Sequence, residues 1–153
     1  MANSIQTMEG TNYGKATGAT NDLVSAGYTQ GRKRLIYDYV EIANASATST
    51  VKFGPPLQPG WMILPSSYII HDALGAGVTL TLGDDDSTTA SDADRYLEAT
   101  LASAAGVIQL NDSAACINKV PYVIQAKCNL ILTIGAATAN GTVRAYIEYT
   151  DGT

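Results

Sequence analysis

The sequence predicts an all-β protein, in which an antiparallel β-sandwich or jelly-roll-like body of residues 34–153 follows an extended N-terminal arm of residues 1–33, with at most one short helix. Three observations lead to this fold class. Apolar and polar residues alternate at period two in several runs, as in strands with one buried face. Clusters of Gly, Pro, Asn and Ser separate these runs. The runs number about seven to nine, at the spacing of an antiparallel sandwich.

The first strand of the body is predicted over residues 35–42, whose side chains alternate between two faces, one of them carrying two tyrosines. A polar turn over 44–49 and a short strand over 51–53 follow. Residues 54–60 contain three prolines. Because proline cannot donate a hydrogen bond to a neighbouring strand, this stretch is predicted to be a loop at a sheet end.

The middle of the chain gives the clearest alternation. Two runs, residues 68–73 and 78–83, flank a turn at Gly75-Ala76-Gly77. In the second run Val78, Leu80 and Leu82 lie on one face and threonines lie on the other, which suits a sheet with one dry and one half-wet surface.

Residues 94–105 form the best helix candidate, since their apolar residues make a stripe at helical spacing. An aspartate is available to cap the start of this helix and Gly106 to cap its end. An irregular segment is the alternative, because the stretch is short.

The C-terminal part contains the remaining strands. A strand is predicted over 107–110, and a second over 119–125, where Pro121 favours a sheet edge. Alternating runs over 128–134 and 143–149 flank an Asn140-Gly141 dipeptide, a strong turn signal, and are predicted to pair as a hairpin.

Length and charge limit the possible functions. The 153 residues fit one domain, and the net charge of −5 argues against nucleic acid and anionic membrane as partners. The start of the chain lacks the pattern of a signal peptide, and no apolar run is long enough to cross a bilayer. We therefore expect synthesis in a cytoplasm, with both cysteines reduced.

The N-terminal arm is the least core-like part of the chain. Residues 1–36 contain four basic and two acidic side chains and have a net charge of +2. Because the net charge of the whole chain is −5, residues 37–153 have a net charge of −7. Two alternatives are open: a disordered terminus, or an arm that orders against a neighbouring subunit. Spaced aromatic and aliphatic residues favour the second, since a solvating tail has no use for them. The interface candidates are Tyr13, Leu23, Tyr28, Arg32, Lys33 and Arg34.

No group of residues predicts catalysis or a cofactor. The single histidine, His71, precedes Asp72, and adjacent strand residues point to opposite faces, so the two cannot act as an oriented pair. Cys116 and Cys128 form no CxxC motif, and one histidine cannot complete a common structural zinc site. We expect a protein that is not an enzyme.

An acidic loop is the one candidate metal site. Its carboxylates could hold calcium. The match to an EF-hand loop is poor, because Thr89 stands where Gly is needed and Arg95 where a Glu ligand is needed. A solvated loop of mutually repelling charges is the favoured alternative. The candidate ligands are Asp84, Asp86, Asp92 and Asp94, with Asp85 beside them.

Tyrosine dominates the aromatic residues, with nine tyrosines against one Phe and one Trp. Tyrosine buries a ring and keeps a hydroxyl for a partner, so it suits interfaces. A tyrosine-rich core edge explains the composition equally well. Trp61 is expected to plug the core or its edge.

The order of these features resembles the head decoration, or capsid cement, proteins of tailed bacteriophages. The likeness covers about residues 55–150 and rests on LQPGWMILPSSYIIHDALGAGVTLTLGDDD at 57–86, DADRYLEATLASAAGVIQL at 92–110 and NLILTIGAATANGTVRAYIEYTDG at 129–152. The resemblance implies a β-sandwich or jelly-roll body on the outside of an icosahedral shell, often as a trimer. It transfers no individual contact residue.

The expected function is therefore that of a structural virion protein that cements a phage capsid from outside. Its expected partners are the major capsid protein and further copies of itself, and it would be made in the host cytoplasm. The alternative is a carbohydrate-binding or fibre and tail attachment module, with calcium as an optional stabiliser.

Overall fold

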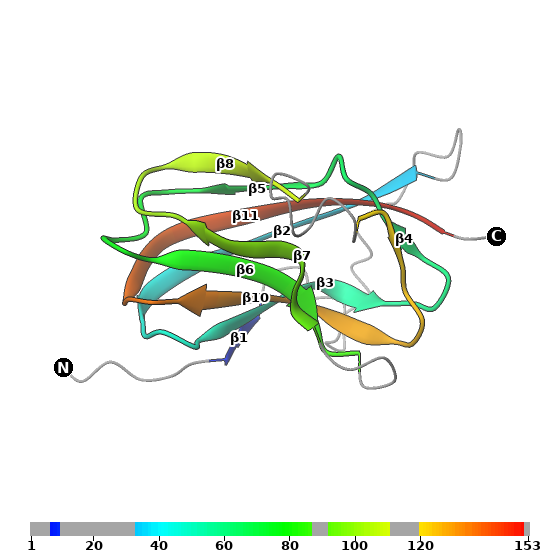
Figure 1. Ribbon diagram of the computed structural model, residues 1–153, viewed down its shortest axis with the longest axis horizontal. Coiled ribbons are helices and arrows are strands. Elements are labelled where there is room, and N and C mark those ends of the chain that lie inside the picture. Colours follow the sequence, from blue (N-terminus) through cyan, green and yellow to red (C-terminus); the bar gives the residue numbers. More distant parts are fainter. Residues whose placement is uncertain (1–6, 10–32, 87–91, 111–119, 152–153) are drawn as a thin grey trace.

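The computed structural model describes residues 7–9, 33–86, 92–110 and 120–151. Within these ranges the chain forms eleven strands and no helix, arranged in two sheets that pack face to face (Figure 1). The all-β sandwich prediction is confirmed.

The first sheet has five strands, and we call it the five-stranded sheet. Its strands, in spatial order, are β1 (Thr7–Glu9), β3 (Thr50–Leu57), β10 (Cys128–Gly135), β6 (Thr79–Asp84) and β7 (Asp92–Leu101). All pairs are antiparallel except β1 with β3, which is parallel.

The second, six-stranded sheet is built around β11 (Ala139–Thr150), which Figure 1 shows running along most of the molecule. One side of β11 pairs with β2 over nearly its whole length. Its other side pairs with β5 and then with β4, and these carry the outer strands β8 and β9. The bounds are β2 (Lys33–Ala45), β4 (Met62–Ile63), β5 (Tyr68–His71), β8 (Gly106–Gln109) and β9 (Tyr122–Val123).

The core lies between the sheets and follows the predicted alternation. In β10 every second residue, from Cys128 to Ile134, is buried, and β11 repeats the pattern from Val143 to Tyr149. Val78 and the leucines of β6 are buried while its threonines are half-exposed, as predicted. Removal of this apolar surface from water drives the sheets together.

The helix prediction for residues 94–105 is wrong, because this stretch belongs mainly to β7. The ladder between β7 and β6 shifts register twice, on either side of Leu82. Such irregularities break the period of two, and Arg95, Tyr96 and Leu97 are buried in succession. The apolar residues of this stretch therefore lack the alternation of a regular strand, and their spacing in the sequence resembles the apolar stripe of a helix.

The predicted C-terminal hairpin is also wrong. β10 and β11 are consecutive but lie in different sheets, so the connection between them crosses the sandwich. Asn140 and Gly141 lie inside β11, where its register against β2 shifts. Gly141 has φ +127°. The Asn140-Gly141 dipeptide therefore forms part of a β-bulge within the strand and not a turn.

The proline-rich stretch is not wholly a loop, since β3 continues to Leu57. Gly54, Pro55 and Pro56 fall where the register against β10 shifts, between the pairs Phe53–Leu130 and Leu57–Cys128. They therefore occupy positions without a ladder partner in β10, where prolines are tolerated. The strand predicted around Pro121 is confirmed as an edge, in the form of the short β9.

One buried carboxylate joins the two sheets. Asp38 lies on β2, is 0% exposed, and accepts a 2.8 Å hydrogen bond at Oδ2 from the backbone N–H of Gly54 on β3. Its Oδ1 accepts a 2.9 Å bond from the N–H of Tyr39. Gly54 has φ +61°, and a Cβ there would lie 2.4 Å from Cγ2 of Ile36. Glycine is therefore required at this approach.

We predict that Asp38→Ala lowers the free energy of unfolding by about 2–3 kcal/mol, because it leaves a buried N–H without its acceptor. Urea unfolding followed by circular dichroism measures this. Glu41→Ala, an exposed carboxylate on the same strand, is the matched control and should cost no more than about 0.5 kcal/mol. Equal urea midpoints for the two variants would contradict the role assigned to Asp38.

Candidate protein interface

The histidine and aspartate at residues 71 and 72 lie as strand alternation predicts. His71 is buried, and its Nδ1 lies 2.8 Å from the carbonyl oxygen of Asp72. The Asp72 carboxylate is turned elsewhere and accepts a 3.0 Å bond from the N–H of Thr142. This bond is the main reason why the pKa of Asp72 is lowered. The two side chains form no catalytic pair.

The described residues contain neither a metal-binding group of side chains nor a membrane-spanning helix. No three side chains of His, Cys, Asp or Glu within residues 7–9, 33–86, 92–110 and 120–151 form a group that could hold a metal ion. In the same ranges no helix has the length and apolar character needed to cross a membrane.

The acidic loop begins with carboxylates that bind protein groups. Asp84 is buried, and its Oδ2 lies 2.8 Å from Nε of Arg95 and accepts a 2.7 Å bond from the hydroxyl of Tyr96. Asp85 accepts a 2.5 Å bond from the backbone N–H of Asn129 and a 2.8 Å bond from its side-chain amide. The start of the loop is therefore tied to β7 and β10.

The rest of the acidic loop lies only partly within the described residues. Asp86 is buried, while Asp92 and Asp94 belong to β7, where Asp92 accepts a 3.4 Å bond from the N–H of Asp94. Residues 87–91 lie outside the described ranges. Calcium binding by this loop stays the less favoured hypothesis. The favoured hypothesis, a solvated loop, does not hold for Asp84 and Asp86, which are buried.

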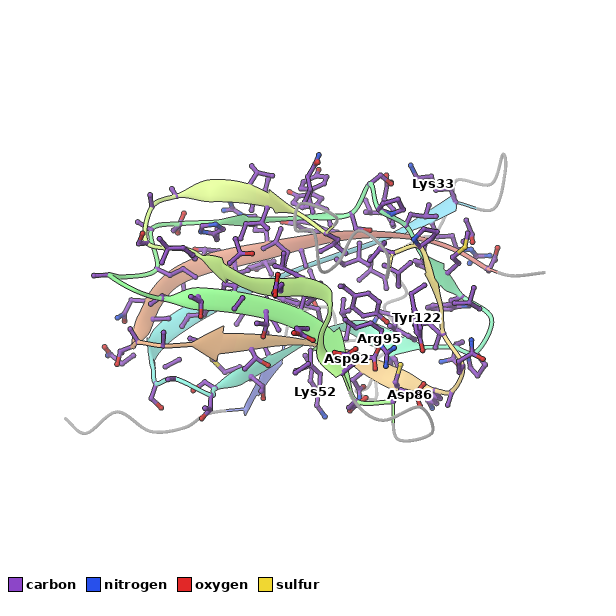
Figure 2. The ribbon with its side chains drawn as sticks, in the orientation of Figure 1. Lys33, Lys52, Asp86, Asp92, Arg95 and Tyr122 are labelled. Atoms are coloured by element: carbon purple, nitrogen blue, oxygen red, sulfur yellow. The ribbon has the colours of Figure 1, made fainter. Side chains whose placement is uncertain are left out.

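A cation–π contact completes the cluster around Arg95, which Figure 2 shows beside Asp86, Asp92 and Tyr122. The guanidinium lies 4.3 Å from the centroid of the Tyr122 ring. Burial of this group lowers the pKa of Arg95, but the neighbouring Asp84 carboxylate and the tyrosines outweigh burial and raise the pKa overall. The contact holds the edge strand β9 against β7.

Two buried groups beside this cluster, the Tyr96 hydroxyl and the Cys128 thiol, stay protonated. Burial, followed by the nearby Asp84 carboxylate, raises the pKa of Tyr96 far above its ordinary value of 10.0. Burial, followed by the charges of Asp84, Asp86 and Asp85, raises the pKa of Cys128 to about 12. Cys128 is therefore a buried, unreactive thiol, and is free as expected.

The basic run at residues 32–34 divides at the start of β2. Lys33 Nζ lies 2.6 Å from Oε2 of Glu148, and Arg34 Nη2 lies 2.7 Å from Oδ2 of Asp151. Burial raises the pKa of Glu148, but its bonds to Lys33 and Ser66 outweigh that effect, and the pKa is lowered. The other arm candidates, Tyr13, Leu23, Tyr28 and Arg32, lie outside the described residues.

Two of the four basic charges assigned to the arm thus belong to the body and pair with acids of the same chain. Without them, residues 1–32 contain two basic and two acidic side chains, so the net positive charge expected of the arm is lost.

The outward face of the six-stranded sheet carries a cluster that we call the tyrosine face. The register places Tyr37 on β2, Tyr146 on β11 and Tyr68 on β5 side by side in one row across the sheet. The next row contains Tyr39, Arg144, Ile70 and Val107. The tyrosine face consists of Leu35, Tyr37, Tyr39, Tyr68, Ile70, Val107 and Tyr146.

The tyrosine rings of one row contact one another. The centroids of Tyr68 and Tyr146 lie 4.8 Å apart with an interplanar angle of 14°, and those of Tyr37 and Tyr146 lie 4.9 Å apart. These separations match the spacing of neighbouring strands, about 4.8 Å. The Tyr68 and Tyr146 rings therefore cover one another, whereas the Tyr37 ring is inclined by 49° to that of Tyr146. Tyrosines gathered on one exposed face are typical of contacts between proteins.

The tyrosine face exposes large apolar groups to solvent. Leu35 is 52% exposed, Tyr39 40% and Val107 61%. The outward face of the five-stranded sheet carries mainly threonines instead, at Thr79, Thr81 and Thr133. Alternation in the sequence could place Tyr37 and Tyr39 on one face. Only the strand order β2-β11-β5 brings Tyr146 and Tyr68 beside them.

Trp61 packs within the structure, as the sequence predicted. Its ring stacks on Tyr149 with centroids 4.2 Å apart and an interplanar angle of 23°. The side chain is partly buried against the core. One face of the indole is therefore unavailable to a ligand.

Comparison with known proteins gave one structural likeness. No protein-family model matches the chain, and no curated protein matches it. The fold is similar to a chain of the solved structure described as the cyanophage Pam1 capsid asymmetric unit, with a TM-score of 0.59 and 16% sequence identity. The likeness covers 87% of this chain and 95% of that chain, so the two are of similar length. At this identity the match establishes the fold.

We predict that stability falls above pH 10, because the unfolded state releases the Tyr96 proton and the folded state keeps it. Each such group removes about 1.4 kcal/mol per pH unit above its unfolded pKa. Urea unfolding between pH 8 and 11 measures the slope. Tyr96→Phe should flatten it, and Tyr39→Phe on the surface should serve as the control. Identical slopes for wild type and Tyr96→Phe would contradict this account.

Proposed function

We propose that this protein is a structural component of a phage capsid, which binds the outer surface of coat subunits and neighbouring copies of itself and so stabilises the shell. The observation that carries the proposal is the fold match to a chain of a capsid asymmetric unit over nearly the full length of both chains. The match supports a capsid-associated structural role.

The described side chains are consistent with a binding role. The polar groups that sequence reasoning singled out are engaged in structural bonds, as for Asp84 with Arg95 and for Asp72 with Thr142. The tyrosine face combines exposed aromatic and aliphatic side chains with the charged Arg144, which lies between Tyr39 and Ile70 in one row. Interfaces between proteins have this anatomy.

A capsid protein of this kind needs no chemistry. Each copy contributes a modest interface with the shell, and contacts between neighbouring copies make release of any one copy slow. A homotrimer fits this scheme and the implied family, and we include it in the proposal. Light scattering during size-exclusion chromatography measures the number of copies.

The carbohydrate-binding alternative is less well supported. Sugar recognition by aromatic residues uses open ring faces, whereas Tyr68 and Tyr146 cover one another and Trp61 stacks on Tyr149. A signal on a glycan array, together with stability lost on addition of EDTA, would favour this alternative over a capsid role.

The first test uses particles of the phage that encodes the chain. We predict that particles made without this protein release DNA at a lower temperature, and that purified protein added back binds them saturably and restores the release temperature. Cryo-electron microscopy of the restored particles should place the added density on the shell exterior. Density confined to the tail, or particles unaffected by loss of the protein, would refute the proposal.

The tyrosine face gives a second test. We predict that Val107→Glu weakens binding to such particles at least tenfold, because it places a charge beside Ile70 at the most exposed apolar position of the tyrosine face. Leu101→Glu is the matched control, since Leu101 is 60% exposed but lies on β7 of the other sheet. Equal binding by the two variants would remove the tyrosine face from the contact.

A further inference from the structure

The edge of the five-stranded sheet is formed by a very short strand. β1 pairs in parallel with β3 through three residues, Thr7 with Thr50, Met8 with Val51 and Glu9 with Lys52. Met8 is partly buried and packs against the core. Without β1, β3 would be the edge strand of the five-stranded sheet and would leave backbone groups unpaired on that side.

The connection between β1 and the body is long. Residues 10–32, which number 23, separate the end of β1 from the first residue of β2. Fully extended, 23 residues reach about 75 Å, whereas the 13 residues of β2, the longest strand, span about 43 Å. The linking segment can therefore carry β1 well beyond its own body.

We propose that the β3 edge, residues Thr50–Lys52, is a docking site for β1 of a second copy of this chain, so that neighbouring copies exchange their first strands. The inference rests on the self-association included in the proposed function, and it names the surface and the segment that would perform it.

Exchange of β1 between copies costs little free energy, because β1 makes the same contacts with β3 of its own chain and with β3 of a second copy. Within one chain, three ladder pairs and one partly buried methionine oppose the conformational entropy lost on ordering the strand. Within an assembly, the second copy holds its β1 at high effective concentration near the vacant edge. Each exchanged strand then joins two bodies.

Disulfide trapping between two different chains tests the exchange directly. One chain carries Thr7→Cys and the other, tagged to differ in size, carries Thr50→Cys. Both also carry Cys116→Ser, while Cys128 is kept because it is buried. The Cα partners of a ladder lie within the range that a disulfide spans. The chains are co-expressed, purified and oxidised with copper phenanthroline.

The matched control replaces the second chain by one with Thr133→Cys. Thr133 lies on β10 and pairs with Thr50, so it is one strand further from β1. We expect the mixed-size disulfide dimer to form at least tenfold more with Thr50→Cys than with Thr133→Cys on a non-reducing denaturing gel.

Two results would overturn the exchange. A mixed dimer no stronger than the control, while a single chain with both Thr7→Cys and Thr50→Cys closes an internal disulfide, would keep β1 on its own body. Failure of both pairs to form would remove β1 from β3 altogether. These outcomes are independent of capsid binding, so a mixed dimer in a protein that does not bind particles would refute decoration and leave the exchange standing.

Discussion

The buried carboxylate of Asp38 is the constraint on which the layout of the sandwich depends. It takes the N–H of Gly54 across the gap between the sheets and the N–H of Tyr39 on its own strand. An inward-pointing charge also protects an edge strand from pairing with other chains. Because Asp38 holds β2 to β3 in this way, the β2 edge of the six-stranded sheet is less suited to pairing with an added strand. The main contribution of β2 to the outer surface is its tyrosines. The short β1 occupies the edge of the opposite sheet.

The two outer faces consequently differ in chemistry. The six-stranded sheet presents tyrosines that contact one another and exposed aliphatic residues such as Val107. The five-stranded sheet presents the partly buried Thr79, Thr81 and Thr133. The ion pair of Asp84 and Arg95 lies at one end of the sandwich, where it fixes β6, β7 and the contact with Tyr122. The ion pair and the cation–π contact therefore stabilise the ends of the strands from which these side chains come.

Local alternation was enough to predict the sandwich, the buried faces of β6, β10 and β11, and the edge position near Pro121. It failed where pairing departs from a regular ladder. Two register shifts made β7 resemble a helix, a bulge placed Asn140 and Gly141 inside a strand, and a third irregularity admitted Pro55 and Pro56 into β3. The tyrosine face could be predicted only in part, because neighbours across a sheet depend on strand order, which no local pattern contains. The same holds for Asp38 and Gly54, which are 16 residues apart and in different sheets.

The position of β11 has a consequence for biosynthesis. This strand is the last of those described, yet it lies at the centre of its sheet and pairs with β2, roughly a hundred residues earlier in the chain. The ribosome therefore releases the β2, β4 and β5 segments before the strand that unites them exists. Contacts of such long range make folding slow, and the six-stranded sheet can close only once residues 139–150 have emerged. A chain that has not yet been synthesised through residue 150 lacks the surface that β2, β11 and β5 form together, so the tyrosine face exists only after β11 has paired.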